Sequence, residues 1–117
     1  MAVPFHSIRR GKPFSCTIQH FADGDTVIIA VQCCCKETWH RVTVRIAGID
    51  SWEVKSRDVL KALWVKVELE KKFKYKRGEL FCKMVNSDKY GRVVGDIKIE
   101  GIMLSEYIIN NKLGWIH

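Results

Sequence analysis

A strict two-residue alternation over residues 41–46, within the segment 40–49 (HRVTVRIAGI), constrains the fold more than any other feature. Val42 and Val44 alternate there with polar side chains, a period that places apolar residues on one face of a strand. The segment 14–21 (FSCTIQHF) alternates in the same way. The run 27–34 (VIIAVQCC) is almost continuously apolar, as in a strand buried on both faces or nearly so. These three segments predict a fold rich in β-strands.

The spacing of apolar residues becomes helical after residue 55. The residues that recur at this spacing are Val59, Leu60, Leu63, Trp64 and Val67. They predict a helix that turns this set of side chains toward the core. Ser56 is a candidate N-cap, and Asp58 falls in the expected first turn, where an acid is favourable. The Lys-rich segment 71–78 (KKFKYKRG) is expected to end the helix.

Two more strands, 79–85 and 92–99, are predicted on either side of the loop 86–91. A short amphipathic helix containing Leu104 and Ile108 follows them. Three strands, a helix, two strands and a helix fit an α+β, mainly β architecture, a five-stranded OB-fold β-barrel with two or three packed helices. A chain of 117 residues has room for one modest core, so we expect residues 1–117 to form a single domain.

The formal net charge of +7 is unevenly distributed. Residues 54–92 hold twelve Lys and Arg against five Asp and Glu, whereas the rest of the chain holds eight of each. Such a block favours a polyanionic partner, either nucleic acid or acidic lipid. The alternative interpretation is a solvated helix face without a partner.

Three of the five cysteines are consecutive, at Cys33–Cys35. Neighbouring cysteines in a strand point to opposite faces, so they cannot all pair with one partner, and a disulfide framework is not expected. A zinc site with the nearby His40 lacks the usual paired spacing. Packing of small apolar side chains or a hairpin tip is the simpler interpretation, and it leans toward a reducing compartment.

Contact with a membrane is not expected from the sequence. No apolar stretch approaches 18 residues, the length that predicts a membrane span. The first fourteen residues lack the apolar core of a signal peptide, so a cytoplasmic location is favoured, and a mature secreted form remains an alternative. Peripheral binding would need an amphipathic helix with large exposed apolar residues, and Leu63, Trp64 and Val67 are expected in the core.

Acidic and basic side chains gather at three expected strand ends and loops. They are Asp23 and Asp25, then Arg45, Asp50 and Glu53, then Lys89, Tyr90 and Arg92. Carboxylates beside arginines suit phosphodiester hydrolysis, because a hard cation takes carboxylate oxygens and guanidinium groups neutralise the phosphate. Taken singly, each group has an ordinary structural interpretation, as a polar turn, a helix-entry signal or a basic turn.

In series, the three groups resemble the motifs of the thermonuclease (staphylococcal-nuclease-like) family. The family reads DGDT, then R-x-x-G-[ILV]-D-[TAS]-P-E, then [KR]-Y-G-R, then a terminal helix. This chain has DGDT at 23–26, RIAGIDSWE at 45–53, KYGR at 89–92 and the helical segment LSEYIINNKLGW at 104–115. The resemblance covers roughly residues 14–116, and it implies the same OB barrel.

By this resemblance, Asp25 and Asp50 would be carboxylate ligands of a calcium ion, or of another divalent cation. The backbone carbonyl of Ser51 would be a third ligand. Glu53 would be the general base or the group that orients the attacking water. The implied activity is that of a metal-dependent nuclease, a hydrolase that cleaves phosphodiester bonds.

The resemblance also assigns the groups that hold the substrate. Arg45 and Arg92 would contact the scissile phosphate, and Lys89 and Tyr90 would hold a second phosphate. The expected partner is DNA or RNA, single-stranded or unpaired, bound by a monomer. The alternative is a catalytically weak or inactive nucleic-acid-binding module, since some related domains keep the barrel and lose the acids and arginines.

Trp52 departs from the family pattern, which has proline at this position. Three roles are open for the indole: a simple replacement of proline, a wedge packed beside the metal ligands, or a platform for a nucleic-acid base. The wedge is the favoured interpretation.

Overall fold

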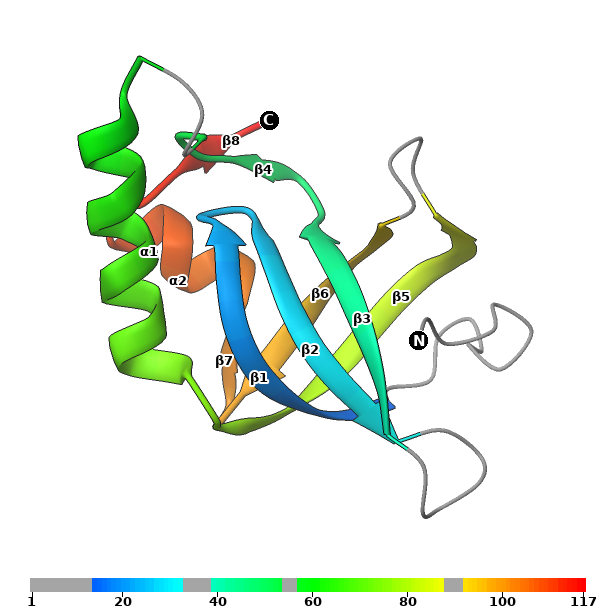
Figure 1. Ribbon diagram of the computed structural model, residues 1–117. Coiled ribbons are helices and arrows are strands. Elements are labelled where there is room, and N and C mark those ends of the chain that lie inside the picture. The colour runs from blue at the N-terminus through cyan, green and yellow to red at the C-terminus, as the bar shows by residue number, and fades with distance from the viewer. Residues whose placement is uncertain (1–13, 33–38, 54–56, 88–91) are drawn as a thin grey trace.

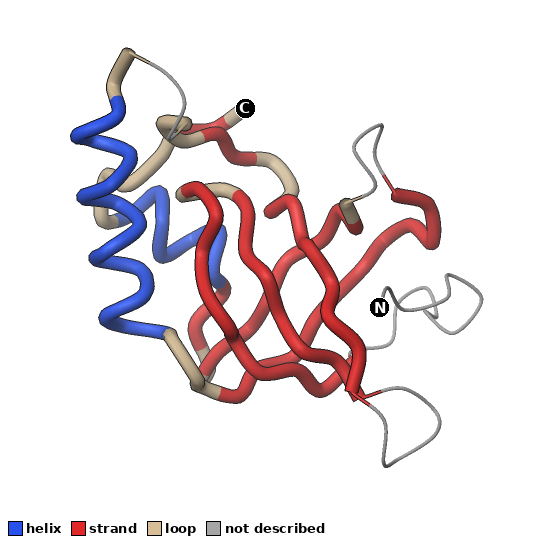
Figure 2. Tube along the Cα trace, in the orientation of Figure 1, coloured by secondary structure: helices blue, strands red, loops and turns tan. Residues whose placement is uncertain are grey.

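Five long strands close into a barrel in the computed structural model, which describes residues 14–32, 39–53, 57–87 and 92–117 (Figures 1 and 2). The strands are β1 (Phe14–Asp23), β2 (Thr26–Gln32), β3 (Trp39–Ile46), β5 (Arg77–Ser87) and β6 (Val93–Ile99). They pair in the order β3-β2-β1-β5-β6, and a parallel pairing of β3 with β6 closes the barrel. The predicted OB-like α+β barrel is therefore confirmed.

Shorter elements complete the described part of the chain. They are β4 (Ile49–Asp50), α1 (Val59–Phe73), β7 (Ile102–Met103), α2 (Leu104–Asn110) and β8 (Trp115–Ile116). Helix α1 packs beside β1, α2 packs against β6, and β4 pairs with β8 at one end of the barrel (Figure 1). The predictions for Cys33–Cys35, Ser56, Lys89 and Tyr90 fall outside the described residues.

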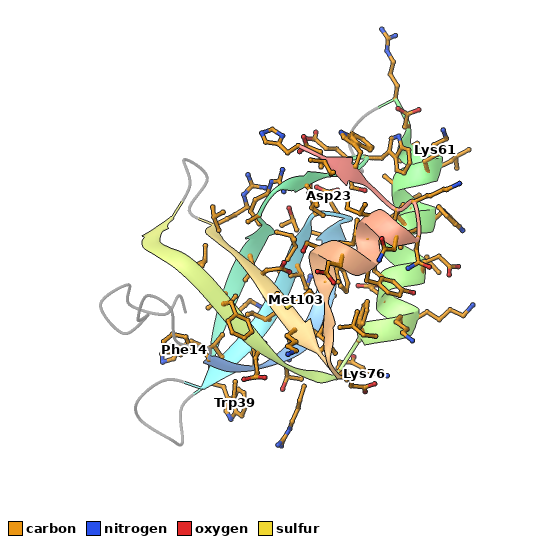
Figure 3. The ribbon with its side chains drawn as sticks, turned by 180° about the vertical axis from the view of Figure 1, so that it is seen from behind. Phe14, Asp23, Trp39, Lys61, Lys76 and Met103 are labelled. Carbon is orange, nitrogen blue, oxygen red and sulfur yellow. The ribbon has the colours of Figure 1, made fainter. Side chains whose placement is uncertain are left out.

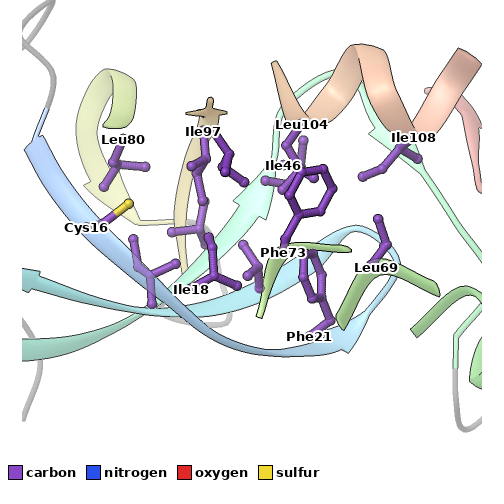
Figure 4. Packing of buried hydrophobic residues seen from close by; sticks show 14 of the residues in the cluster. Cys16, Ile18, Phe21, Ile46, Leu69, Phe73, Leu80, Ile97, Leu104 and Ile108 are labelled. Carbon is purple, nitrogen blue, oxygen red and sulfur yellow. The ribbon is translucent and has the colours of Figure 1, made fainter. Parts of the chain in front are cut away.

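The barrel interior contains the apolar residues that the alternation predicts. Val42, Val44 and Ile46 of β3 are buried, whereas the intervening Arg41 is exposed and Arg45 is partly exposed. Leu69 and Phe73 of α1 and Leu104 and Ile108 of α2 join the barrel residues in the same core (Figure 4). One continuous core thus holds the strands and both helices together.

The predicted buried face of the long helix is wrong. The residues of α1 that are buried are Ala62, Val65, Leu69 and Phe73. Leu60, Leu63, Trp64 and Val67 are 80%, 41%, 51% and 57% exposed, respectively. Helix α1 is apolar on two opposite sides, so its periodicity predicts a helix without indicating which side packs on the barrel. The helix also begins later than predicted, at Val59, with Asp58 as the N-cap.

Candidate functional site

Strand pairing brings the ends of three distant sequence motifs together at one end of the barrel. Thr26 at the start of β2 lies opposite Arg45 at the end of β3, and the Ile46 N–H donates to the Asp25 carbonyl at 2.8 Å. Strand β6 begins beside β3, with Val93 next to Val44, so Arg92 arrives at the same end. The barrel closure itself therefore gathers the candidate site.

The carboxylate of Asp25 is buried and lies at the centre of a hydrogen-bond network. The Thr26 hydroxyl donates to Asp25 Oδ1 at 3.0 Å, and the Ser51 N–H donates to Asp25 Oδ2 at 3.3 Å. Arg92 Nη1 donates to the Thr26 hydroxyl at 3.3 Å. Thr26 therefore links Asp25 to Arg92, and chains of this kind hold each member in a fixed orientation.

Arg45 lies between the two candidate metal-binding carboxylates. Its Nη2 atom is 2.6 Å from Asp50 Oδ1 and 3.6 Å from Asp25 Oδ2. Its Nη1 atom donates to the Ile46 carbonyl at 2.7 Å, which fixes the guanidinium plane. Burial raises the pKa of Asp25 above its usual value, and the positive charge of Arg45 offsets part of this increase. The two carboxylates thus share one cationic partner.

Two glycines allow the segments around the site to approach closely. A Cβ atom at Gly24 would lie 2.2 Å from Ser51 Oγ and 2.7 Å from Val65 Cγ1, and one at Gly114 would lie 2.4 Å from the Asp50 carbonyl oxygen. No side chain fits at such distances without displacing backbone or core atoms. The β1–β2 turn, β4 and the segment before β8 are therefore packed directly against one another.

Trp52 packs as part of this assembly. It is partly buried against the core, and its ring meets Trp115 edge-to-face with centroids 5.2 Å apart. Lys61 Nζ of α1 lies 5.2 Å from the centroid of the Trp52 ring. This packing is the geometry expected of a wedge. Ser51 is tied to the same region, because its hydroxyl donates to the Leu113 carbonyl at 2.6 Å.

The structure gathers Asp25, Arg45, Asp50 and Ser51 in one set of contacts, with Arg92 joined through Thr26. Glu53 is exposed and lies three residues beyond Asp50, on the segment that follows β4. Lys89 and Tyr90 lie outside the described residues, so their predicted phosphate contacts stay predictions.

Two residues at the site were not assigned a role from the sequence. Thr26 stands inside the DGDT motif, but the resemblance assigns roles only to the carboxylates of that motif. His117 Nδ1 lies 2.5 Å from Asp50 Oδ2, and the His117 N–H donates to the Gly48 carbonyl at 3.0 Å. No local pattern predicts the contacts of His117 with Asp50 and Gly48, because they depend on the pairing of β8 with β4, which lie more than sixty residues apart in the sequence.

The donor chemistry of the site suits a hard cation. No group of three or more His, Cys, Asp or Glu side chains forms a ligand set within residues 14–32, 39–53, 57–87 and 92–117. The carboxylates of Asp25 and Asp50 nevertheless both reach one Arg45 nitrogen, so their oxygens are near neighbours. Calcium prefers oxygen ligands and commonly completes its shell with water. These oxygens are of the kind that a divalent cation prefers, and in this structure Arg45 lies between them.

Comparison with models of known protein families gives no match, and no curated protein sequence matches this chain.

Proposed function

We propose that this protein is a metal-dependent nuclease that hydrolyses phosphodiester bonds of single-stranded or unpaired DNA or RNA. The observation that carries the proposal is the contact of one Arg45 nitrogen with both Asp25 and Asp50. Two carboxylates and a guanidinium in one place are the groups that phosphoryl chemistry uses, since they can hold a cation and neutralise a phosphate. The order of the three motifs supports the same activity.

In this proposal Asp25, Asp50 and the Ser51 carbonyl would hold calcium or another divalent cation. The cation would polarise a phosphoryl oxygen and lower the charge that an attacking water must approach. Glu53 would accept a proton from that water. At the same time the water oxygen would form the new bond to phosphorus, and the bond from phosphorus to the leaving oxygen would break. Glu53 is solvent-exposed, so a water molecule can reach its carboxylate.

The two arginines would act on the phosphate. Arg45 is partly exposed and Arg92 is half-buried, and both lie where β3 ends and β6 begins. A guanidinium donates two parallel hydrogen bonds to phosphate oxygens, so it can neutralise the charge that grows in the transition state. Arg45 would exchange its carboxylate partners for the substrate phosphate when a cation occupies the carboxylates. Lys89 and Tyr90 would hold the next phosphate along the strand.

A nucleic-acid-binding module without cleavage activity is the second candidate. It is favoured by the same ion pair, because Arg45 already neutralises both carboxylates and a pair that is satisfied in this way can be purely structural. In that case the polar cluster would hold the barrel end together, and nucleic acid would bind through basic residues alone. The two candidates differ in the role of Glu53, which the nuclease needs for cleavage and the binding module does not use.

The experiment compares cleavage of labelled single-stranded DNA and RNA by the wild-type protein and Glu53→Gln, first with calcium and then with EDTA. We expect wild-type cleavage that needs calcium and a loss of about 10²-fold or more in turnover for Glu53→Gln. Glu79→Gln is the matched control, since Glu79 is an exposed carboxylate on β5. It should cleave at the wild-type rate, and a loss confined to Glu53→Gln excludes a contaminating nuclease, which would act equally in all three preparations.

Binding of the oligonucleotide without cleavage would favour the second candidate. Cleavage by Glu53→Gln at the wild-type rate would remove Glu53 from the mechanism. Absence of both binding and cleavage would contradict both candidates.

A further inference from the structure

Helix α1 has an apolar face that points away from the barrel. Its buried residues, Ala62, Val65, Leu69 and Phe73, follow one side of the helix. On the opposite side is a second series at helical spacing, here called the outer ridge: Leu60, Leu63, Trp64 and Val67. Each residue of the outer ridge is more than 40% exposed, and Leu60 is the most exposed of them. The helix therefore presents apolar side chains to both the core and the surroundings.

Such a ridge is unusual for a helix on a protein surface. Single exposed apolar residues are common and need no explanation, but four adjacent large ones form a patch of the kind that marks an interaction site. The outer ridge thus needs an occupant.

The charges beside the outer ridge are mainly positive. Lys71 follows Val67 by one turn on the same side, and Lys72 is the next residue of the last turn, with its Nζ atom 6.0 Å from the centroid of the Tyr107 ring of α2. Two acids lie in the same part of the helix: Glu68, one turn after Trp64 and partly exposed, and Glu70, which is directed toward the barrel, where its Oε2 accepts the Phe21 N–H at 2.9 Å. Lys61 extends over the Trp52 ring near the other end of the helix. The occupant must therefore accept apolar side chains and carry negative charge at the Lys71 end.

Few partners combine these two properties. Nucleic acid would accept the lysines but offers no apolar phase for Leu60 and Val67. A second copy of this chain, packed ridge to ridge, would cover the leucines but would offer no cluster of acidic side chains to Lys71 and Lys72, because the N-cap of α1, Asp58, lies between Arg57 and Lys61 in the sequence. The surface of an anionic lipid bilayer accepts both groups, because acyl chains lie directly beneath charged phosphates. Tryptophan is favoured at that boundary.

We propose that the outer ridge of α1 docks on an anionic phospholipid membrane, with the helix axis lying along the surface. Leu60, Trp64 and Val67 enter the boundary between headgroups and acyl chains, and Lys71 and Lys72 contact lipid phosphates. The protein binds the surface without crossing it. Within the described residues, no helix is long and apolar enough to cross a membrane. This docking does not depend on nuclease activity.

The C-terminal part of the outer ridge lies away from the candidate nuclease site, whereas its first residue, Leu60, neighbours Lys61, whose Nζ lies over the Trp52 ring beside that site. Figure 3 shows Lys61 near the end of α1 that approaches β8, and Lys76 at the opposite end. The lysines at the C-terminal end of α1 thus lie away from the β4–β8 end of the barrel, where Asp50 pairs with Trp115. Part of the positive block found in the sequence is therefore assigned to lipid.

The test measures co-sedimentation with vesicles of phosphatidylcholine containing about 30% phosphatidylserine and with vesicles of phosphatidylcholine alone. We expect the wild-type protein to bind the anionic vesicles more tightly. Leu60→Ser/Trp64→Ser should lose at least about tenfold in partitioning, since each buried apolar side chain contributes strongly to the interface. Lys71→Gln/Lys72→Gln should lose about fivefold per lysine.

Trp39→Ser is the matched control. Trp39 is about as exposed as Trp64, at 48%, and lies at the other end of the barrel from Lys61 (Figure 3). Its loss should leave vesicle binding unchanged. Quenching of tryptophan emission by brominated lipid gives a second readout, which Trp64→Phe should reduce and Trp39→Phe should not. Thermal melts check that every variant is folded.

Equal binding of wild-type and Leu60→Ser/Trp64→Ser to anionic vesicles would overturn the proposal, as would absence of wild-type binding. A concentration-dependent dimer in analytical ultracentrifugation that is lost in Leu60→Ser/Trp64→Ser would assign the outer ridge to a second copy instead. Loss of oligonucleotide binding in Lys71→Gln/Lys72→Gln, with vesicle binding intact, would assign the lysines to nucleic acid and contradict the proposal.

Discussion

The cluster around Asp25 and the outer ridge of α1 depart from ordinary packing in opposite directions. At the barrel end a carboxylate is buried, although charged groups are normally exposed. On α1, four large apolar side chains are exposed, although such groups are normally buried. The first departure is partly compensated inside the molecule, by hydrogen bonds and Arg45. The outer ridge has no such compensation among the contacts described for α1. This difference supports the proposal that an external surface covers the ridge.

The largest effect on stability is expected from Arg45→Ala. Removing the guanidinium leaves Asp25 and Asp50 as neighbouring negative charges, one of them buried. Breaking a pair of this kind by deleting one partner commonly destabilises a protein by about 3 kcal/mol or more. Urea unfolding should show this loss. Arg41→Ala is the control, because Arg41 is exposed on the same strand and should cost less than about 0.5 kcal/mol.

A smaller loss for Arg45→Ala, equal to that of Arg41→Ala, would mean that the carboxylates do not need their cationic partner. The cluster would then not be the strained, compensated region that the comparison describes.

A moderate gain is expected from Asp25→Asn at neutral pH. Burial raises the pKa of Asp25, so the folded protein holds this proton more tightly than the unfolded chain does. The stability of the wild-type protein therefore falls as pH rises from the usual carboxyl range through the raised pKa. Asparagine does not titrate there. Thermal melts should give Asp25→Asn the higher midpoint at pH 7.

The advantage of Asp25→Asn should shrink as pH falls below the usual carboxyl pKa, where Asp25 is protonated in both states. A lower midpoint for Asp25→Asn at every pH would show that the negative charge itself stabilises the fold, contrary to the expected direction.

The smallest effect on stability is expected at the outer ridge. Leu60→Ser and Trp64→Ser remove side chains that are already exposed, so each should change the free energy of unfolding by less than about 0.5 kcal/mol. Val65→Ala, on the inner side of the same helix, should cost about 2 kcal/mol because Val65 is fully buried. Urea unfolding of these variants separates the two faces. A loss above about 1 kcal/mol for Leu60→Ser would show that the outer ridge packs inside the protein.

The sequence predicts the strands well because alternation is a local signal. Val42, Val44 and Ile46 face the core as expected, and the pairing of β2 with β3 follows from adjacent strands. The face of α1 could not be predicted from periodicity, because both sides repeat with a helical period. Larger side chains on the outer side, such as Trp64, gave that side the stronger signal, and the true inner side begins with the small Ala62.

At the candidate site, too, local sequence patterns predict only part of the contacts. The motifs predicted that Asp25, Arg45 and Asp50 belong together, and strand pairing places them in contact. The contacts of His117 with Asp50 and of Trp115 with Trp52 depend on residues more than sixty positions apart. A wedge at Trp52 could be proposed from its size, but its partner Trp115 could not.

Calcium titration by calorimetry, with thermal melts at the same concentrations, tests most directly whether the Asp25–Asp50 pair is a metal site. The account predicts that the wild-type protein binds calcium and is stabilised by it. Asp50→Asn should bind at least about tenfold more weakly, because it removes a charged ligand. Glu79→Gln, on the surface of β5, should bind as the wild type does. No heat of binding and no change in melting temperature at millimolar calcium would contradict the account.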